Sequence, residues 1–254
     1  MAKIYSKEKL PKRIEGYSIY PLNDDVIIRA NSGFTSDGVK NDPKYELTRH
    51  NASEFGRVSS LCKIMRLSLM GILPKNSGRG VSNLLVKKMK SVVFSDRRSL
   101  RGNRRLCKAF LNEMALREMI GYDFNPNYSL PHVLKKNFTL NGLGCLILND
   151  LNFADSFLFP EKSNCIGIRL HHLDFDFVTG ESSLSSSGWL FFEKDSTITD
   201  FIIDLAYPAA LKGVLFSLAE LQFFVFEDGF VPLVDDVGKI VTVLGCSNTL
   251  KVQA

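Results

Sequence analysis

The chain of 254 residues is long enough for one large domain or two smaller ones. Its hydrophobic content of 45% and its 19 phenylalanines argue against disorder, and no apolar run reaches the roughly 20 residues that a membrane span needs. The net charge of +5 is unevenly distributed: residues 1–130 contain 24 Lys and Arg against 12 Asp and Glu (+12), whereas residues 131–254 contain 8 against 15 (−7).

The first 20 residues are polar and basic, and they predict an extended basic arm. No apolar stretch of the kind found in a secretory signal follows the basic start, so we expect cytoplasmic synthesis, with the final location open. Val26–Ile28 predicts a short strand. Asp42 and Pro43 then form a good helix start, with Asp as the N-cap and Pro at the first helical position.

Three helices are predicted in the basic half, so residues 21–130 should contain a short strand and about three helices. The first covers 43–70, with a break near Asn51 left open, because its apolar residues recur at steps of three and four. The second covers 81–93 and the third 103–120. The side chains expected to be buried are Phe55, Val58, Cys62, Met65, Leu69, Leu84, Leu85, Met89, Val92, Leu106, Phe110 and Met114.

After Pro131 apolar and polar residues alternate in short runs. The pattern predicts strands at 134–140, 143–149, 164–178, 187–193, 198–206, 213–226 and 239–245, with a tight hairpin at 227–230. Residues 131–254 should therefore form an antiparallel β-sandwich, immunoglobulin-like in the broad sense. The fold class is α+β. No flexible linker divides the halves, so they either share one core or form two domains.

The segment 165–178 shows a shift in its alternation. Ile166, Ile168 and Leu170 share one face, whereas Leu173 and Phe175 carry the apolar pattern on the other. Because a one-residue slip moves every side chain to the opposite face, we predict a bulge or kink at residues 171–172.

Catalytic and metal-binding signatures are weak. Five cysteines without a CxxC pair indicate reduced thiols. His172, Asp174 and Asp176 alternate along one strand and could bind a cation, but a solvent-facing polar side is the favoured interpretation. No nucleophile or phosphate-loop motif is present. We therefore expect no enzyme activity, metal or cofactor. A deep pocket lined by two or more acids would revive an enzyme of scattered carboxylates.

The strongest functional signal is a basic run between the second and third predicted helices. It supplies a candidate protein interface or polyanion-binding surface: Arg97, Arg98, Arg101, Arg104, Arg105, Lys87, Lys88 and Lys90. The candidate acidic counterpart is Asp174, Asp176, Asp235 and Asp236. Phe94 and Phe110 only flank the run, whereas proteins that bind single strands interleave aromatic residues with charge.

The charge asymmetry favours a non-enzymatic structural or assembly protein that associates with itself or with another protein. Opposite charges at opposite ends of a subunit suit head-to-tail contact, which builds rings or filaments. The alternative is a nucleic-acid or polyanion-binding protein that uses the same arginines. A third interpretation is that the two halves neutralise each other within one subunit.

The segment DDVIIRANSGFTSDGVKNDPKYELTRHNASEFG (24–56) resembles a group of uncharacterised proteins from Bacteroidetes. The residues that carry the resemblance are Val26 to Ala30, Gly33, Pro43, Arg49, Asn51, Ser53, Glu54, Phe55 and Gly56. A weaker likeness continues to GYDFNPN (121–127), and Phe34 departs from the pattern. The resemblance implies a bacterial or mobile-element origin, and it implies no activity, cofactor or site residue.

Overall fold

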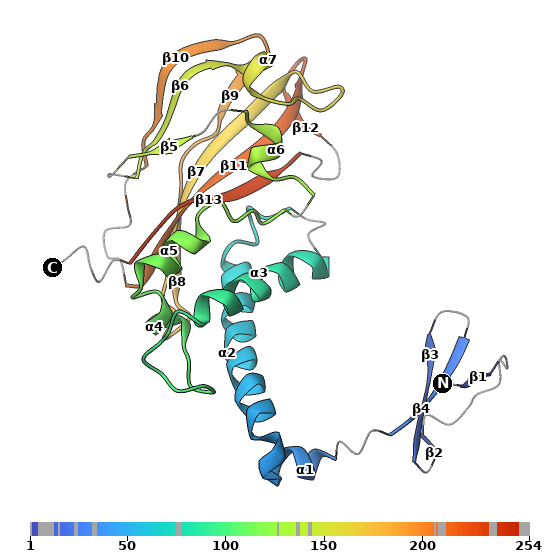
Figure 1. Cartoon of the computed structure of the whole chain (residues 1–254). Helices are drawn as coiled ribbons and strands as arrows, with labels where there is room; N and C mark the ends of the chain where they lie inside the picture. The colour runs from blue at the N-terminus through green and yellow to red at the C-terminus, as the bar shows by residue number, and fades with distance from the viewer. Residues whose placement is uncertain are drawn as a thin grey trace. The chain divides into compact units, whose positions relative to one another are not determined.

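The computed structural model describes residues 2–4, 13–14, 16–22, 25–31, 35–74, 78–125, 127–135, 138–141, 144–205, 207, 212–233 and 238–248. The chain divides into two units, Met1–Ala52 and Ser53–Ala254, and the division falls within helix α2 (Glu46–Ser68). Helices and antiparallel sheets together confirm the α+β class (Figure 1).

The first unit contains a four-stranded antiparallel sheet in the order β1 (Ala2–Ile4), β4 (Asp25–Ala30), β3 (Tyr17–Leu22) and β2 (Arg13–Ile14). Ile19 on β3 and Ile27 on β4 are its buried side chains among the described residues. The described parts of residues 1–20 are thus strands of a sheet, which differs from the predicted extended arm. The predicted strand at 26–28 lies within β4.

Side-chain caps begin the short helices that follow this sheet. Thr35 accepts a hydrogen bond from the Gly38 N–H and caps α1 (Ser36–Asn41). Asp42 accepts from the Lys44 N–H and caps the 3-10 helix η1 (Pro43–Tyr45), as the Asp-Pro pair predicted.

The helices of the second unit differ from prediction at the third helix and at two side chains expected to be buried, because Phe55 is 48% exposed and Leu84 is 40% exposed. Helix α2 runs without a break, and α3 (Gly78–Val93) matches the second predicted helix. The third predicted helix is divided into α4 (Leu106–Ala109) and α5 (Glu113–Met119), because the Asn112 side chain accepts the Met114 N–H and starts a new helix. The new start changes the helical phase, so Met114 is 74% exposed instead of buried.

The β-rich part forms two antiparallel sheets, with α6 (Leu130–Val133) and α7 (Phe153–Ser156) in its connections. The six-stranded sheet has the order β12 (Phe230–Pro232), β11 (Val214–Phe226), β7 (Cys165–Phe175) and β8 (Ser182–Ser186), with β13 (Ile240–Asn248) paired to β11 and β9 (Leu190–Glu193) to β7. The three-stranded sheet has the order β10 (Thr197–Ile203), β6 (Leu146–Asn152) and β5 (Thr139–Leu140). The hairpin predicted at 227–230 joins β11 to β12.

The six-stranded sheet is covered on both faces, because successive residues of a strand point to opposite sides. Leu173 and Phe175 of β7 pack in one cluster with apolar residues of α2, α3 and α5. Ile166, Ile168 and Leu170 pack in a second cluster with the three-stranded sheet. The helices after residue 53 therefore share a core with the β-rich part (Figure 1).

The bulge predicted at residues 171–172 is wrong. The pairing of β7 with β11 is continuous from Cys165 opposite Phe224 to Phe175 opposite Val214. The apolar pattern changes parity because the covered face changes along the strand, from the three-stranded sheet to the helices. The irregularities lie in neighbouring strands: a register shift in the pairing of β11 with β13, and a break between β8 and β9.

Candidate functional site

The predicted basic run forms a loop between α3 and α4, which we call the basic loop (residues 97–105). Buried Asp96 holds both ends of this loop, because one carboxylate oxygen accepts the N–H groups of Arg98 and Ser99 at 3.2 and 3.1 Å and the other accepts the Arg105 N–H at 3.1 Å. Burial alone would raise the pKa of Asp96, but these hydrogen bonds outweigh it and hold the pKa below its usual value.

A second anchor fastens the middle of the basic loop to α2. The Glu54 carboxylate, 1% exposed, accepts the Gly102 N–H at 2.6 Å. The Arg57 guanidinium donates to the Gly102 carbonyl and, at 2.6 Å, to the Ser53 hydroxyl. Gly102 has φ +92°, a left-handed conformation that favours glycine. The loop is thus held at both ends and at its middle by buried or half-buried charged groups.

The anchored loop presents a basic outer surface. Among the described residues, no ion pair joins Arg97, Arg98 or Arg105 to a carboxylate. Leu100 lies between the arginines with 81% of its surface exposed. The exposed basic side chains of the loop are Arg97, Arg98, Arg101 and Arg105.

The remaining predicted basic residues have neighbours of their own. Arg104 is half-buried, and its guanidinium lies 5.2 Å from the centroid of the Phe94 ring. On α3, Lys88 pairs with Glu118 at 3.7 Å and Lys90 lies 5.7 Å from the Phe55 ring centroid. Lys87 is exposed. The structure therefore gathers the five arginines in one loop and places the three lysines on the preceding helix.

The predicted acidic counterpart does not form the expected surface. Asp174 is 5% exposed, and its two oxygens accept the N–H groups of Lys212 and Gly213 at 2.8 and 3.1 Å. Asp176 is half-buried and accepts from the Val178 N–H and the Thr179 hydroxyl. These carboxylates fix turns, so the prediction of them as exposed counter-charges is corrected. Asp235 and Asp236 lie outside the described residues.

His172 shares a face of β7 with Asp174, but that face is buried rather than solvent-facing as predicted. One ring nitrogen of His172 lies 3.2 Å from the Leu205 carbonyl and the other 3.0 Å from the Ser217 hydroxyl. Burial lowers the pKa of His172 below its usual value. Within the described residues, no three His, Cys, Asp or Glu side chains are grouped to hold a metal ion.

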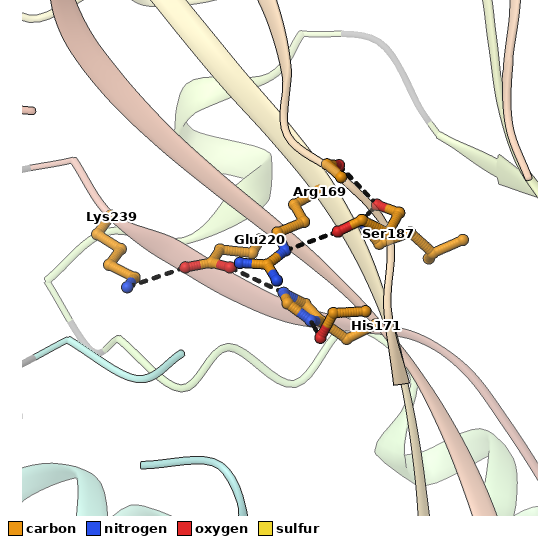
Figure 2. Close-up of polar contacts among 8 residues, drawn as sticks. Arg169, His171, Ser187, Glu220 and Lys239 are labelled. Carbon is orange, nitrogen blue, oxygen red and sulfur yellow. Dashed lines mark hydrogen bonds and ion pairs between the residues drawn. The ribbon is translucent and has the colours of Figure 1, made fainter. Parts of the chain in front are cut away.

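On the opposite face of β7 lies a buried ionic network that the sequence did not reveal (Figure 2). His171 contacts the Glu220 carboxylate at 2.8 Å and the Ser186 hydroxyl at 2.7 Å, and Lys239 contacts Glu220 at 2.9 Å. Burial alone would raise the pKa of Glu220, but the His171 hydrogen bond and the Lys239 charge hold it below its usual value. Mutual pairing of this kind makes buried charges tolerable inside a sheet.

The sequence offered a partial signal for this network. Glu220 is the one acid in the apolar run VLFSLAELQFFVF, and His171 lies in a strand whose other polar residues are Arg169, His172 and Asp174. A charge inside such a run predicts a buried partner. Strand register, which sequence alone does not supply, was needed to identify that partner.

A hollow of about 460 Å³ bears on the enzyme alternative, because two acids, Asp174 and Glu181, line it with Lys212. Asp174 is already engaged by two backbone N–H groups. Glu181 pairs with Lys212 at 3.3 Å on the surface. Each carboxylate thus has a structural partner: Asp174 anchors a turn, and Glu181 forms a surface ion pair.

All five cysteines are free thiols, as the sequence predicted. Burial raises the pKa of Cys62 to about 12 and that of Cys165 to about 11, so both thiols stay protonated at neutral pH. No helix among the described residues has both the length and the apolar character to cross a membrane.

Comparison of the chain with protein-family models, curated proteins and solved structures finds no match. The resemblance of residues 24–56 to a Bacteroidetes group stays a prediction, because none of these comparisons bears on it.

Proposed function

We propose that this protein is a non-enzymatic assembly protein whose copies associate head to tail through the basic loop. One observation carries the proposal: four exposed arginines and an exposed leucine lie on one loop that buried Asp96 and Glu54 hold in place. A fixed loop loses little conformational entropy on binding, so its charges favour association more than those of a mobile tail. Leu100 supplies the apolar anchor that a protein interface requires.

The surface that would receive this loop lies elsewhere than the sequence predicted. Exposed Asp155, Glu193 and Asp195 lie near the end of β6 and at the β9–β10 turn. The hydrogen bond from the Phe153 N–H to the Ser196 carbonyl at 3.1 Å brings these two segments together. Figure 1 shows α7 and α4 at opposite ends of the second unit. We infer that this acidic end of one copy contacts the basic loop of the next.

The proposal includes an immunoglobulin-like sandwich, in the broad sense, as the body of the subunit. Its support is the apolar cluster shared by the six-stranded and three-stranded sheets, because two sheets packed face to face bury one common layer of side chains. Such a rigid body would hold the basic and acidic ends at a fixed separation, which repeated head-to-tail contact requires.

Two surface variants test the proposal by sedimentation velocity. The first variant, Arg97→Glu/Arg98→Glu/Arg101→Glu, reverses the charge of the basic loop. The second, Asp155→Lys/Glu193→Lys/Asp195→Lys, reverses the charge of the acidic end. The wild type should grow in mass with concentration and dissociate as salt is raised, whereas each variant alone should stay monomeric. Mixed at equal concentration, the two variants should assemble again, because the native loop matches the native acidic end and the reversed loop matches the reversed end.

The matched control is Lys40→Glu/Lys44→Glu/Lys63→Glu, which changes the net charge equally at exposed lysines outside both proposed surfaces and should assemble like the wild type. A wild type that remains monomeric at all concentrations, or a variant mixture that does not assemble, would contradict the proposal.

A second candidate, nucleic-acid binding, is favoured by one contact. Exposed Phe94 beside Arg104 supplies an aromatic ring next to the arginines. Fluorescence anisotropy with a labelled single-stranded oligonucleotide distinguishes the two. Affinity that falls steeply with salt and is lost in Phe94→Ala would support this second function over self-assembly.

A further inference from the structure

A half-open cleft beside the basic loop has a role in neither candidate function. Its volume is about 520 Å³, within the range of small-molecule sites. Residues of α2, the start of α4 and the turn after β7 form its walls. The apolar part of the lining comes from Val58, Leu61, Leu106, Cys107, Phe177 and Val178.

The charged part of this lining has one sign. Arg57, Arg104, Arg105 and Lys108 border the cleft, and no described Asp or Glu lines it. The nearby acids are directed elsewhere: Asp96 and Glu54 are buried and accept backbone N–H groups of the basic loop. An apolar hollow with a cationic rim matches a ligand that has an apolar body and an anionic head.

Gly56 lines the cleft from the middle of α2, where glycine costs about 1 kcal/mol relative to alanine. Close packing does not account for glycine at this position, because a Cβ there would meet no atom within 4 Å. The absence of a side chain leaves the cleft open along α2.

We propose that this cleft binds a medium-chain aliphatic carboxylate. The alkyl chain would lie against Val58, Leu61 and Phe177, and the carboxylate would face Arg104 and Arg105. Lys108 contributes less directly, because its ammonium donates to the Ser99 hydroxyl at 3.0 Å. Arg105 belongs both to the rim of this cleft and to the basic loop, but the test of self-association changes none of the cleft residues.

Isothermal titration calorimetry with hexanoate, octanoate and decanoate, each below its micelle concentration, tests both parts of the ligand. Affinity should rise about fourfold for each methylene buried, the fold-change that corresponds to about 0.8 kcal/mol per methylene. Decyltrimethylammonium, with a tail one methylene longer and a cationic head, should bind at least tenfold more weakly than decanoate. Equal binding of the two amphiphiles, or no dependence on chain length, would overturn the proposal.

Two leucine variants locate the ligand. Gly56→Leu fills the cleft and improves helix propensity, so it should remain folded and lose at least tenfold in decanoate affinity. Gly80→Leu is the matched control, since Gly80 is also an exposed helical glycine whose added Cβ would meet no atom within 4 Å. Arg104→Gln/Arg105→Gln should weaken the binding of decanoate and strengthen that of decyltrimethylammonium, because the rim loses two positive charges. If Gly56→Leu and Gly80→Leu bound decanoate with equal affinity, the ligand would lie outside the cleft and the proposal would be wrong.

Discussion

At the scale of single residues, burial sets the ionisation of His172. Its two ring nitrogens contact one carbonyl and one hydroxyl, and the Tyr207 ring centroid lies 4.7 Å from that of the imidazole. A neutral imidazole satisfies this arrangement by donating to the Leu205 carbonyl and accepting from Ser217. An imidazolium would place a charge on a face of the sheet where burial penalises it, so His172 should be neutral in the folded protein.

We predict that His172 makes the protein less stable in mild acid. Because burial lowers its folded-state pKa, the unfolded chain binds more protons as the pH falls below the usual histidine pKa of about 6.5. Stability should therefore be full above that pH and decline below it. Urea unfolding at pH 7.5 and 5.5 measures the change.

His172→Gln should lower stability at pH 7.5 by about 1 kcal/mol, because one well-placed hydrogen bond is lost, and should reduce the decline in acid. His132→Gln changes an exposed histidine and should keep the decline. An unaltered pH dependence in His172→Gln would contradict the assignment.

At the scale of elements, the basic loop owes its conformation to groups outside the arginine run. Like charges on neighbouring residues repel, and the Asp96 and Glu54 carboxylates offset this repulsion by holding loop N–H groups. Asp96 directly precedes the loop and Glu54 lies on α2, so changing these two anchors should alter the loop more than changing the arginines does.

We predict that Asp96→Ala destabilises the protein by about 1–3 kcal/mol, because three backbone N–H groups lose their acceptor. Hydrogen exchange should report the loss directly, with faster exchange at residues 98, 99 and 105. Asp195→Ala removes an exposed carboxylate and should change stability by less than about 0.5 kcal/mol. Unchanged exchange at residue 105 would show that Asp96 does not hold the loop.

Sequence periodicity predicted most elements, because steps of three and four or of two follow from helix and strand geometry. Helices α2 and α3 and strands β7 and β11 lie where it placed them. It failed where a side chain overrides the local pattern: Asn112 divides the third helix by capping a new one. Periodicity also failed on β7, where it predicted a bulge. A bulge and a change in which face of the strand is covered shift the apolar alternation in the same way, so the sequence does not distinguish them.

The candidate site was predictable in part. Composition located the five arginines, since a dense basic run is visible in any sequence. It could not show that Asp174 turns inward to bind backbone N–H groups, because an acid on a strand looks the same whether it faces solvent or a turn. The cleft beside the basic loop also escaped prediction, because its walls come from segments more than a hundred residues apart.

At the scale of the whole molecule, stability should reside in the second unit. Both large apolar clusters consist of residues from Val58 onward, and helices and sheets contribute jointly to each of them. In the first unit, the described buried apolar side chains are Ile19 and Ile27. A sheet with so few buried apolar groups contributes little to the free energy of unfolding.

We therefore predict that a chain beginning at Asp42, the residue that caps η1, keeps the thermal stability of the whole protein. Its main melting transition, followed by circular dichroism, should move by less than about 3 °C, which for a domain of this size corresponds to roughly 1 kcal/mol. Leu85→Ala in the full chain provides the contrast, because Leu85 is fully buried and its truncation should cost about 2–5 kcal/mol. If the shortened chain melted at or below the temperature of Leu85→Ala, the first unit would be shown to stabilise the second.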